Sequence, residues 1–156
     1  MSLATSDNTL GDAAARLRLA ITRTARRLRQ EASLGELTPT STATLATIER
    51  HGPLTPSEVA EIERIRRPSA TRSLRCLEDA GLVRRTPDPA DGRSSLLTIT
   101  APGRERLRRL RVRKNAYLAR RMRDLPPEDV ATLERAAAIL ERIQESERPG
   151  AEGERG

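Results

Sequence analysis

Aromatic side chains, cysteine and histidine are almost absent from this sequence of 156 residues. It contains one tyrosine and no phenylalanine or tryptophan, and Cys76 and His51 are its single cysteine and histidine. One cysteine excludes an intrachain disulfide and a thiolate metal cluster. No serine lies in a G-x-S-x-G motif, and a Ser-His-Asp triad would depend on His51 alone. We therefore predict that the protein is not an enzyme and holds neither a cofactor nor a metal ion.

Long apolar stretches are also missing. No run approaches the roughly 20 consecutive apolar residues of a membrane span. The stretch MSLATSDNTLGD at residues 1–12 lacks the basic and apolar regions of a secretory signal. We therefore expect a cytoplasmic protein with no membrane partner, and a length that suits one domain with one core.

Positive charge is in excess, and it is unevenly distributed. The formal net charge is +7, and residues 101–124 carry ten basic and two acidic groups, whereas residues 125–156 carry four and eight. Every basic residue except Lys114 is arginine, which is well suited to bidentate contacts with phosphate and guanine. A GC-rich genome would produce the same bias, so the charge permits a nucleic-acid partner without proving one. The arginines of residues 104–123 either flank bound DNA or pair with the acidic segment 128–147, and we favour the pairing.

Cap signals predict two short helices in succession. Thr38-Pro39 has the pattern of an N-cap followed by proline at the first helical position, for a helix that stops at residues 51–53. Thr55 and Glu58 have the spacing of a capping box at the start of a second helix.

A third helix and a hairpin follow. The helix begins near Pro68 and ends at Ala80-Gly81, where glycine can adopt the left-handed conformation of a helix end. Two short helices joined by a tight turn predict a helix-turn-helix. Residues 82–86 and 95–100 read as strands joined by a loop of proline, aspartate and glycine. We therefore predict a mainly α fold with a small β-hairpin, in the layout of a winged helix.

The third helix and the hairpin also contain a recognisable motif. From Arg72 the sequence follows R-x-L-x-x-L-E-x-x-G-L-V-x-R, and D-P-x-D-x-R begins at Asp88. In order and spacing, the segment from Leu54 to Leu107 resembles the multiple antibiotic resistance regulator (MarR) family of bacterial transcription factors. Gly92 stands where that family often has an arginine, while the following Arg93 is retained. The resemblance implies a regulator of transcription, more often a repressor, that binds specific sequences in double-stranded DNA.

The recognition helix supplies most of the candidate DNA-binding residues. Such a helix presents the residues near its N-terminus to base edges and phosphates, and the segment from Arg64 to Arg75 contains five arginines and no acid. The resemblance implies that Arg93 enters the minor groove and that Asp91 orients a neighbouring arginine. The complete candidate set is Arg67, Ser69, Thr71, Arg72, Arg75, Arg84, Arg85, Asp91, Arg93 and Ser94.

Amphipathic helices are predicted on both sides of the winged-helix lobe. Residues 10–30 carry an apolar stripe, Thr100 caps a long helix, and another begins near Pro127. The resemblance implies that these helices interlock with a second subunit, so that a homodimer would bind an inverted repeat. We accordingly divide the chain into an N-terminal arm and dimerisation helix (1–37), a DNA-binding lobe (38–100), C-terminal dimerisation helices (101–146) and a disordered tail (147–156).

Regulation is the least constrained part of the prediction. The resembled family commonly releases DNA when a small organic acid, often aromatic, binds between the DNA lobe and the dimer helices, or when a cysteine is oxidised. With Tyr117 as the one aromatic residue, such a pocket would be aliphatic and lined by arginine, and packing explains Cys76 better than sensing does. Two alternatives stay open: a nucleoid-type protein that binds DNA without sequence preference, and a winged-helix module that docks a protein.

Overall fold

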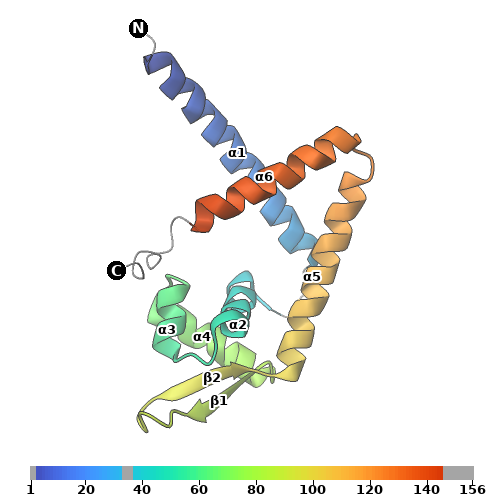
Figure 1. Cartoon of the computed structure of the whole chain (residues 1–156). Helices are drawn as coiled ribbons and strands as arrows, with labels where there is room; N and C mark the ends of the chain where they lie inside the picture. The colour runs from blue at the N-terminus through green and yellow to red at the C-terminus, as the bar shows by residue number, and fades with distance from the viewer. Residues whose placement is uncertain (1–2, 33–36, 146–156) are drawn as a thin grey trace, which may run out of the picture. The chain divides into compact units, whose positions relative to one another are not determined.

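The computed structural model describes residues 3–32 and 37–145, and the chain divides into two units, residues 1–117 and 118–156. The tail predicted at residues 147–156 lies outside the described residues. The elements are α1 (Leu3–Ala32), α2 (Pro39–His51), α3 (Pro56–Ile62), α4 (Arg67–Asp79), β1 (Val83–Pro87), β2 (Ser95–Ile99), α5 (Ala101–Met122) and α6 (Pro127–Glu145), as Figure 1 shows. Within the described ranges, no helix is both long and apolar enough to cross a membrane. The predicted mainly α fold with one hairpin is confirmed.

The short helices of the lobe begin and end at the predicted cap residues. Thr38 Oγ1 accepts a hydrogen bond from the Ser41 amide at 3.1 Å. Thr55 Oγ1 accepts from the Glu58 amide at 3.3 Å, and the Glu58 carboxylate accepts from the Thr55 amide at 2.7 Å, so the capping box is complete. Gly81 has the left-handed φ of 68° after α4. The local signals in the sequence therefore set these helix boundaries.

One hydrophobic core joins the three helices of the lobe to the hairpin. Its largest fully buried apolar side chains come from α2, α3, α4 and β2: Leu45, Ile48, Val59, Leu74, Leu77 and Leu97. The core extends to Ala32 at the end of α1 and to Leu107 and Leu110 of α5. Complete burial of each such side chain stabilises the folded lobe by about 1.5–3 kcal/mol. The lobe therefore holds the residues on its surface in fixed positions.

A residue outside the hairpin also pairs with β2, which the sequence analysis did not predict. β1 and β2 are antiparallel, with Val83 opposite Ile99 and Pro87 opposite Ser95. Leu54, between α2 and α3, donates its amide to the Leu97 carbonyl at 3.2 Å and accepts from the Leu97 amide at 2.7 Å. This bridge attaches the inner strand of the hairpin to the start of the helix-turn-helix, so the wing does not depend on β1 alone.

The predicted helices on either side of the lobe are present. α1 begins earlier than the predicted residue 10, and Thr100 Oγ1 accepts from the Gly103 amide at 3.2 Å at the start of α5. Both α1 and α6 leave large apolar side chains exposed, among them Leu10, Leu17, Ile21, Leu133, Ile139 and Ile143. These side chains lie on helices whose apolar stripes need a covering surface.

Candidate nucleic-acid interface

The N-terminal half of α4 displays a polar, cationic face. Ala70, Leu74 and Leu77 are buried, and their spacing of three and four residues turns one side of the helix into the core. The predicted contact residues occupy the other side and are exposed: Arg67, Ser69, Thr71, Arg72 and Arg75. The structure therefore gathers these five candidates on a single accessible helix face.

The beginning of α4 carries no compensating negative charge. Arg66 occupies the N-cap position with an extended backbone and makes no side-chain capping bond, and the first turn contains no acidic residue. The helix dipole makes such an end partially positive. A helix start of this kind favours a phosphate oxygen as its partner.

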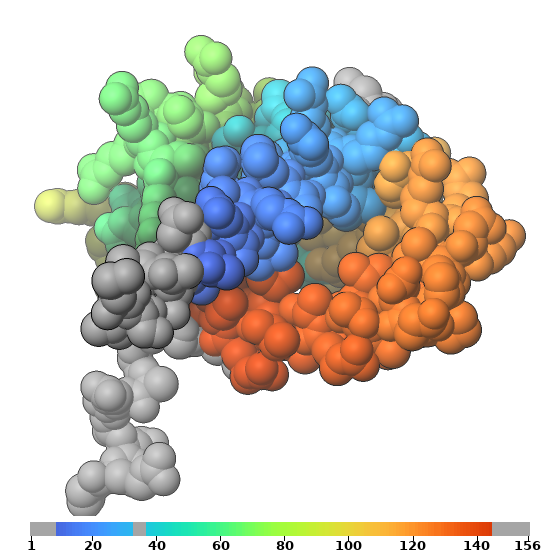
Figure 2. All heavy atoms as spheres, turned by 90° about the horizontal axis from the view of Figure 1, so that it is seen from above, coloured from blue at the N-terminus to red at the C-terminus, as the bar shows by residue number. Residues whose placement is uncertain are grey.

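The arginines of this face also lack acidic partners. Among the residues that the structure describes, no ion pair includes Arg67, Arg72 or Arg75. In Figure 2 the green side chains of the lobe stand out as separate projections at the surface. Guanidinium groups that are exposed and unpaired are available for an external anion, whereas groups held in internal ion pairs are not.

Arg84 and Arg85, two neighbouring candidates on β1, differ in their surroundings. Arg85 donates to both carboxylate oxygens of Glu78, at 2.7 and 3.1 Å, and to Ser95 Oγ at 2.8 Å. The Glu78 hydrogen bond raises the pKa of Arg85. Arg84 is exposed opposite Thr98 and belongs to no ion pair of the described residues. Arg85 thus fastens the hairpin to α4, and Arg84 is the arginine of β1 without an acidic partner among the described residues.

The wing loop is stiffened by two aspartates. Asp88 Oδ1 accepts from the Ala90 amide at 2.9 Å, and Asp91 Oδ1 accepts from the Arg93 amide at 3.0 Å. The Ser94 amide donates to the Asp91 carbonyl at 2.8 Å. Aspartates commonly stabilise turns in this way. Asp91 thus fixes the backbone of Arg93, and the Arg93 side chain is exposed in the wing loop.

Comparison with known proteins identifies the family. The family model described as "MarR family" matches residues 37–95. An uncharacterized HTH-type transcriptional regulator of Mycobacterium leprae is 36% identical over 131 residues, which cover 83% of this chain and 92% of the relative. The chain belongs to the MarR family. It is accordingly a transcriptional regulator with the winged-helix fold of DNA-binding proteins.

Solved structures agree with this assignment. A Pseudomonas aeruginosa protein described as a transcriptional regulator has a TM-score of 0.78 and 33% identity, covering 88% of this chain and 96% of its own. A Staphylococcus aureus MepR mutant, solved bound to an oligodeoxyribonucleotide, has a TM-score of 0.64 and 20% identity over 87% of this chain and 98% of its own. At that identity the MepR comparison shows the shared fold alone.

Three arginines of α5 in this MarR-family chain pair with acids that the sequence analysis did not single out. Arg108 and Arg109 both pair with Glu105 of the same helix, at 2.7 and 2.9 Å, and these hydrogen bonds lower the pKa of Glu105 to about 2. Arg111 pairs with Glu49 of α2. These pairs lie within residues 1–117, and the expected pairing with the acidic segment 128–147 of the other unit stays a prediction. Helical spacing explains the first two pairs, because residues three and four apart face one another.

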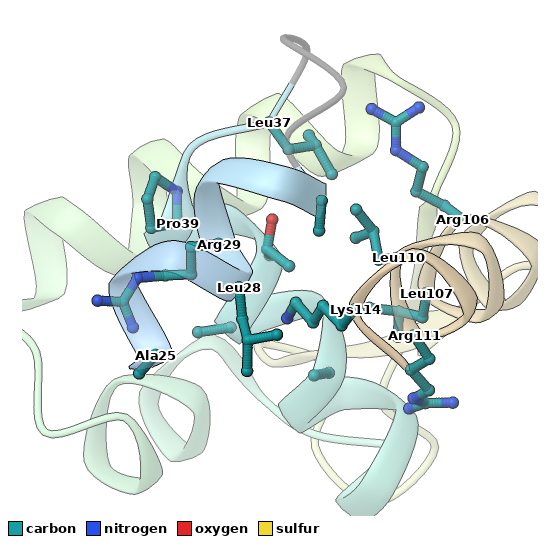
Figure 3. Close-up of a pocket in the computed structure, with 14 residues that line it drawn as sticks. Ala25, Leu28, Arg29, Leu37, Pro39, Arg106, Leu107, Leu110, Arg111 and Lys114 are labelled. Atoms are coloured by element: carbon teal, nitrogen blue, oxygen red, sulfur yellow. The ribbon is translucent and has the colours of Figure 1, made fainter. Parts of the chain in front are cut away.

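A cavity between α1, α2 and α5 was not located from the sequence. Its volume is about 400 Å³, and its walls are mainly apolar, with Leu28, Leu107 and Leu110 among them. This volume falls within the usual range for small-molecule sites. The sequence analysis predicted walls that are aliphatic and lined by arginine, and both residue types are present. In Figure 3, however, the cation directed into the cavity is the ammonium group of Lys114, whereas the guanidinium groups of Arg29 and Arg111 point away from it. In the sequence, Lys114 is distinguished only by being the single lysine of the chain.

Proposed function

We propose that this protein acts in the bacterial cytoplasm as a homodimeric repressor that binds an inverted-repeat operator in duplex DNA. The observation that carries the proposal is the exposed face of α4, whose arginines have no acidic partners in the described structure, beside a stiffened wing that ends in Arg93. Arg72 and Arg75 suit bidentate contacts with guanine or phosphate, and Arg93 suits a narrow A·T-rich minor groove.

The apolar faces of α1 and α6 support the homodimer. In this proposal residues 1–37 and 101–146 form the dimer, and residues 38–100 bind DNA. The exposed leucines and isoleucines on both helices supply an apolar surface for a second copy. Two copies of α4 would then enter successive major grooves about 34 Å apart, which requires a two-fold symmetric site.

Selection of bound duplexes from a random DNA library by the full-length protein tests this function. The expected result, at near-physiological salt, is an enriched inverted repeat with half-sites about one helical turn apart. Binding without an enriched sequence would instead identify a nucleoid-type protein with a steep salt dependence. No binding to any duplex would reject DNA recognition and favour a protein-docking module.

Single substitutions separate base contacts from phosphate contacts. Arg72→Ala and Arg75→Ala should each cost about 1–3 kcal/mol of binding free energy and alter the selected sequence if the arginine contacts a base. Arg93→Ala should weaken the preference for A·T pairs beside each half-site. Arg18→Ala, which removes an exposed arginine from α1, is the control and should change neither property.

We further propose that an organic acid binds in the cavity of Figure 3 and releases the protein from DNA. The support is the inward ammonium group of Lys114, which forms no ion pair with any described residue, in a mainly apolar cavity. An apolar pocket with one convergent cation fits a carboxylate attached to an aliphatic or aromatic body. Such a ligand lowers DNA affinity if it binds the DNA-free conformation more tightly.

Thermal unfolding with benzoate and octanoate as probes tests the acid site. Either probe, if bound, should raise the melting temperature of the wild type and reduce its operator affinity. Lys114→Met should abolish both effects while leaving binding of the operator intact. Arg113→Ala removes a neighbouring exposed cation outside the cavity lining and serves as the matched control. A Lys114→Met protein that responds as the wild type does would reject the assignment.

A further inference from the structure

Two helices of the lobe end with the same hydrogen-bonding pattern but with different residues at the critical position. After α3, the Arg64 amide donates to the Glu61 carbonyl at 3.1 Å and the Ile65 amide to the Ala60 carbonyl at 3.0 Å. After α4, the Gly81 amide donates to the Glu78 carbonyl at 2.9 Å and the Leu82 amide to the Leu77 carbonyl at 2.9 Å. Both ends are Schellman motifs, which require a left-handed residue just past the helix.

Arg64 occupies this left-handed position without the usual glycine. Its φ is 50° and that of Gly81 is 68°, and Arg64 is the one non-glycine residue with a positive φ among those described. This conformation is unfavourable for a residue with a Cβ atom, and it lowers the ratio of folded to unfolded protein by roughly five- to thirty-fold. Glycine at residue 64 would close the same motif without that penalty, as it does at residue 81.

Backbone hydrogen bonds hold Arg64 in place, but no side-chain ion pair or hydrogen bond of Arg64 among the described residues offsets this strain. The Arg64 side chain is exposed and takes part in none of the ion pairs there. The adjacent Glu63 carboxylate, the nearest acid in sequence, accepts a hydrogen bond from the Thr47 hydroxyl of α2. The side chain of Arg64 therefore has no visible structural role that would explain its retention in a strained conformation.

The position of Arg64 suggests what the side chain does. It lies in the turn that leads into α4, and Arg66 and Arg67 follow it at the uncapped start of that helix. In a docked helix-turn-helix, phosphates border the groove that the recognition helix enters. We infer that Arg64 binds a DNA phosphate beside the major groove and that this contact is obtained at the expense of lobe stability. The inference rests on the proposed DNA-binding function.

The variant Arg64→Gly separates strain from contact because it should change stability and affinity in opposite directions. Its melting temperature should rise by about 2–8 °C, as expected for a chain of this size when a left-handed side chain is replaced by glycine. Its DNA affinity should fall several-fold on every duplex alike, and each lost phosphate contact should reduce the slope of log K against log[salt] by about 1. Arg64→Lys keeps both the charge and the strain, so it should keep the wild-type melting temperature and most of the affinity.

Each contrary outcome overturns a distinct part of the inference. If Arg64→Gly is more stable but binds every duplex with wild-type affinity and salt slope, Arg64 does not contact a phosphate. If Arg64→Gly is less stable than the wild type, the side chain supports the fold and the strain argument is wrong. If the wild type itself binds no duplex, the proposed function fails first and the phosphate assignment falls with it, which the wild-type measurement alone reveals.

Discussion

Replacement of Gly103, near the start of α5, by alanine should reduce the free energy of unfolding. The residue is buried, and a Cβ atom there would lie 2.2 Å from the Leu82 carbonyl oxygen and 2.8 Å from Ile99 Cγ1. Thr100 holds the same junction together: its hydroxyl donates to the Gly81 carbonyl at 2.7 Å and accepts from the Gly103 amide at 3.2 Å. Because a backbone oxygen cannot rotate away as a side chain can, Gly103→Ala must displace α5 from the end of α4.

The expected cost follows from two opposing contributions. Overpacking that moves backbone typically costs about 1–3 kcal/mol and occasionally more, whereas alanine in a helix recovers about 0.5–1 kcal/mol relative to glycine. The clash at residue 103 is with main chain, so we expect a net loss of about 2 kcal/mol. For a chain of this length, that corresponds to a decrease of about 4–8 °C in melting temperature.

Two other glycines provide matched controls. A Cβ atom at Gly81 or at Gly92 would meet nothing within 4 Å, but Gly81 has a φ of 68° and Gly92 has no positive φ. Gly81→Ala should therefore cost about 1 kcal/mol from conformation alone, and Gly92→Ala should stay within about 0.5 kcal/mol of the wild type. Urea unfolding followed by circular dichroism at one fixed protein concentration measures the order. A Gly103→Ala midpoint at or above that of Gly81→Ala would refute the close-approach argument.

Three further predictions concern single side chains. Thr44→Val should stabilise the lobe by about 1 kcal/mol, because the buried Thr44 hydroxyl has no hydrogen-bond partner among the described residues and its removal ends a desolvation cost. Urea unfolding measures this change, and a loss of stability would refute the argument. Hydrogen bonds from Thr55 lower the pKa of Glu58 below its ordinary value of 4.5, so the stability they provide is present above that value and is lost as the pH falls through the lowered pKa. Urea midpoints from about pH 6 to about pH 2 should therefore decline less for Glu58→Gln than for the wild type. Arg85→Ala should reduce stability by at most about 1 kcal/mol, because its ion pair is partly exposed, and should weaken DNA binding less than Arg84→Ala does.

Local signals in the sequence predicted the parts of the lobe that depend on local physics. Thr38 and Thr55 cap the following helices because their hydroxyls reach amides close by in the chain, and Gly81 ends α4 because its backbone tolerates a positive φ. The inward face of α4 followed from the spacing of its apolar residues. Each of these features is decided within a few residues, so a sequence pattern is sufficient to predict it.

The features that the sequence did not reveal depend on contacts between distant segments. Nothing near Leu54 indicates that it pairs with Leu97, and both Arg84 and Arg85 fit a strand beside DNA until the position of Glu78 is known. The partner of Arg111 lies 62 residues away along the chain. Side-chain direction is similarly hidden, because periodicity alone did not indicate that Lys114 would turn into a cavity.

α2 contacts both the cavity and the turn that leads into α4. Its residues Thr42, Ala43 and Ala46 line the cavity, and Glu49, one helical turn further on, pairs with Arg111 of the cavity wall. From the same helix Thr47 donates its hydroxyl to Glu63, the residue before the strained Arg64. An acid that fills the cavity would lie against Thr42, Ala43 and Ala46, so the position of α2 would depend on the occupant. A resulting shift of α2 would reach the turn that leads into α4, because the hydrogen bond between Thr47 and Glu63 links the two. Since Arg64 is strained in its present conformation, a rearrangement of that turn costs less than it would at an unstrained position. The same strain that is proposed to place a cation beside the phosphates would therefore also make DNA binding more responsive to the occupant of the cavity.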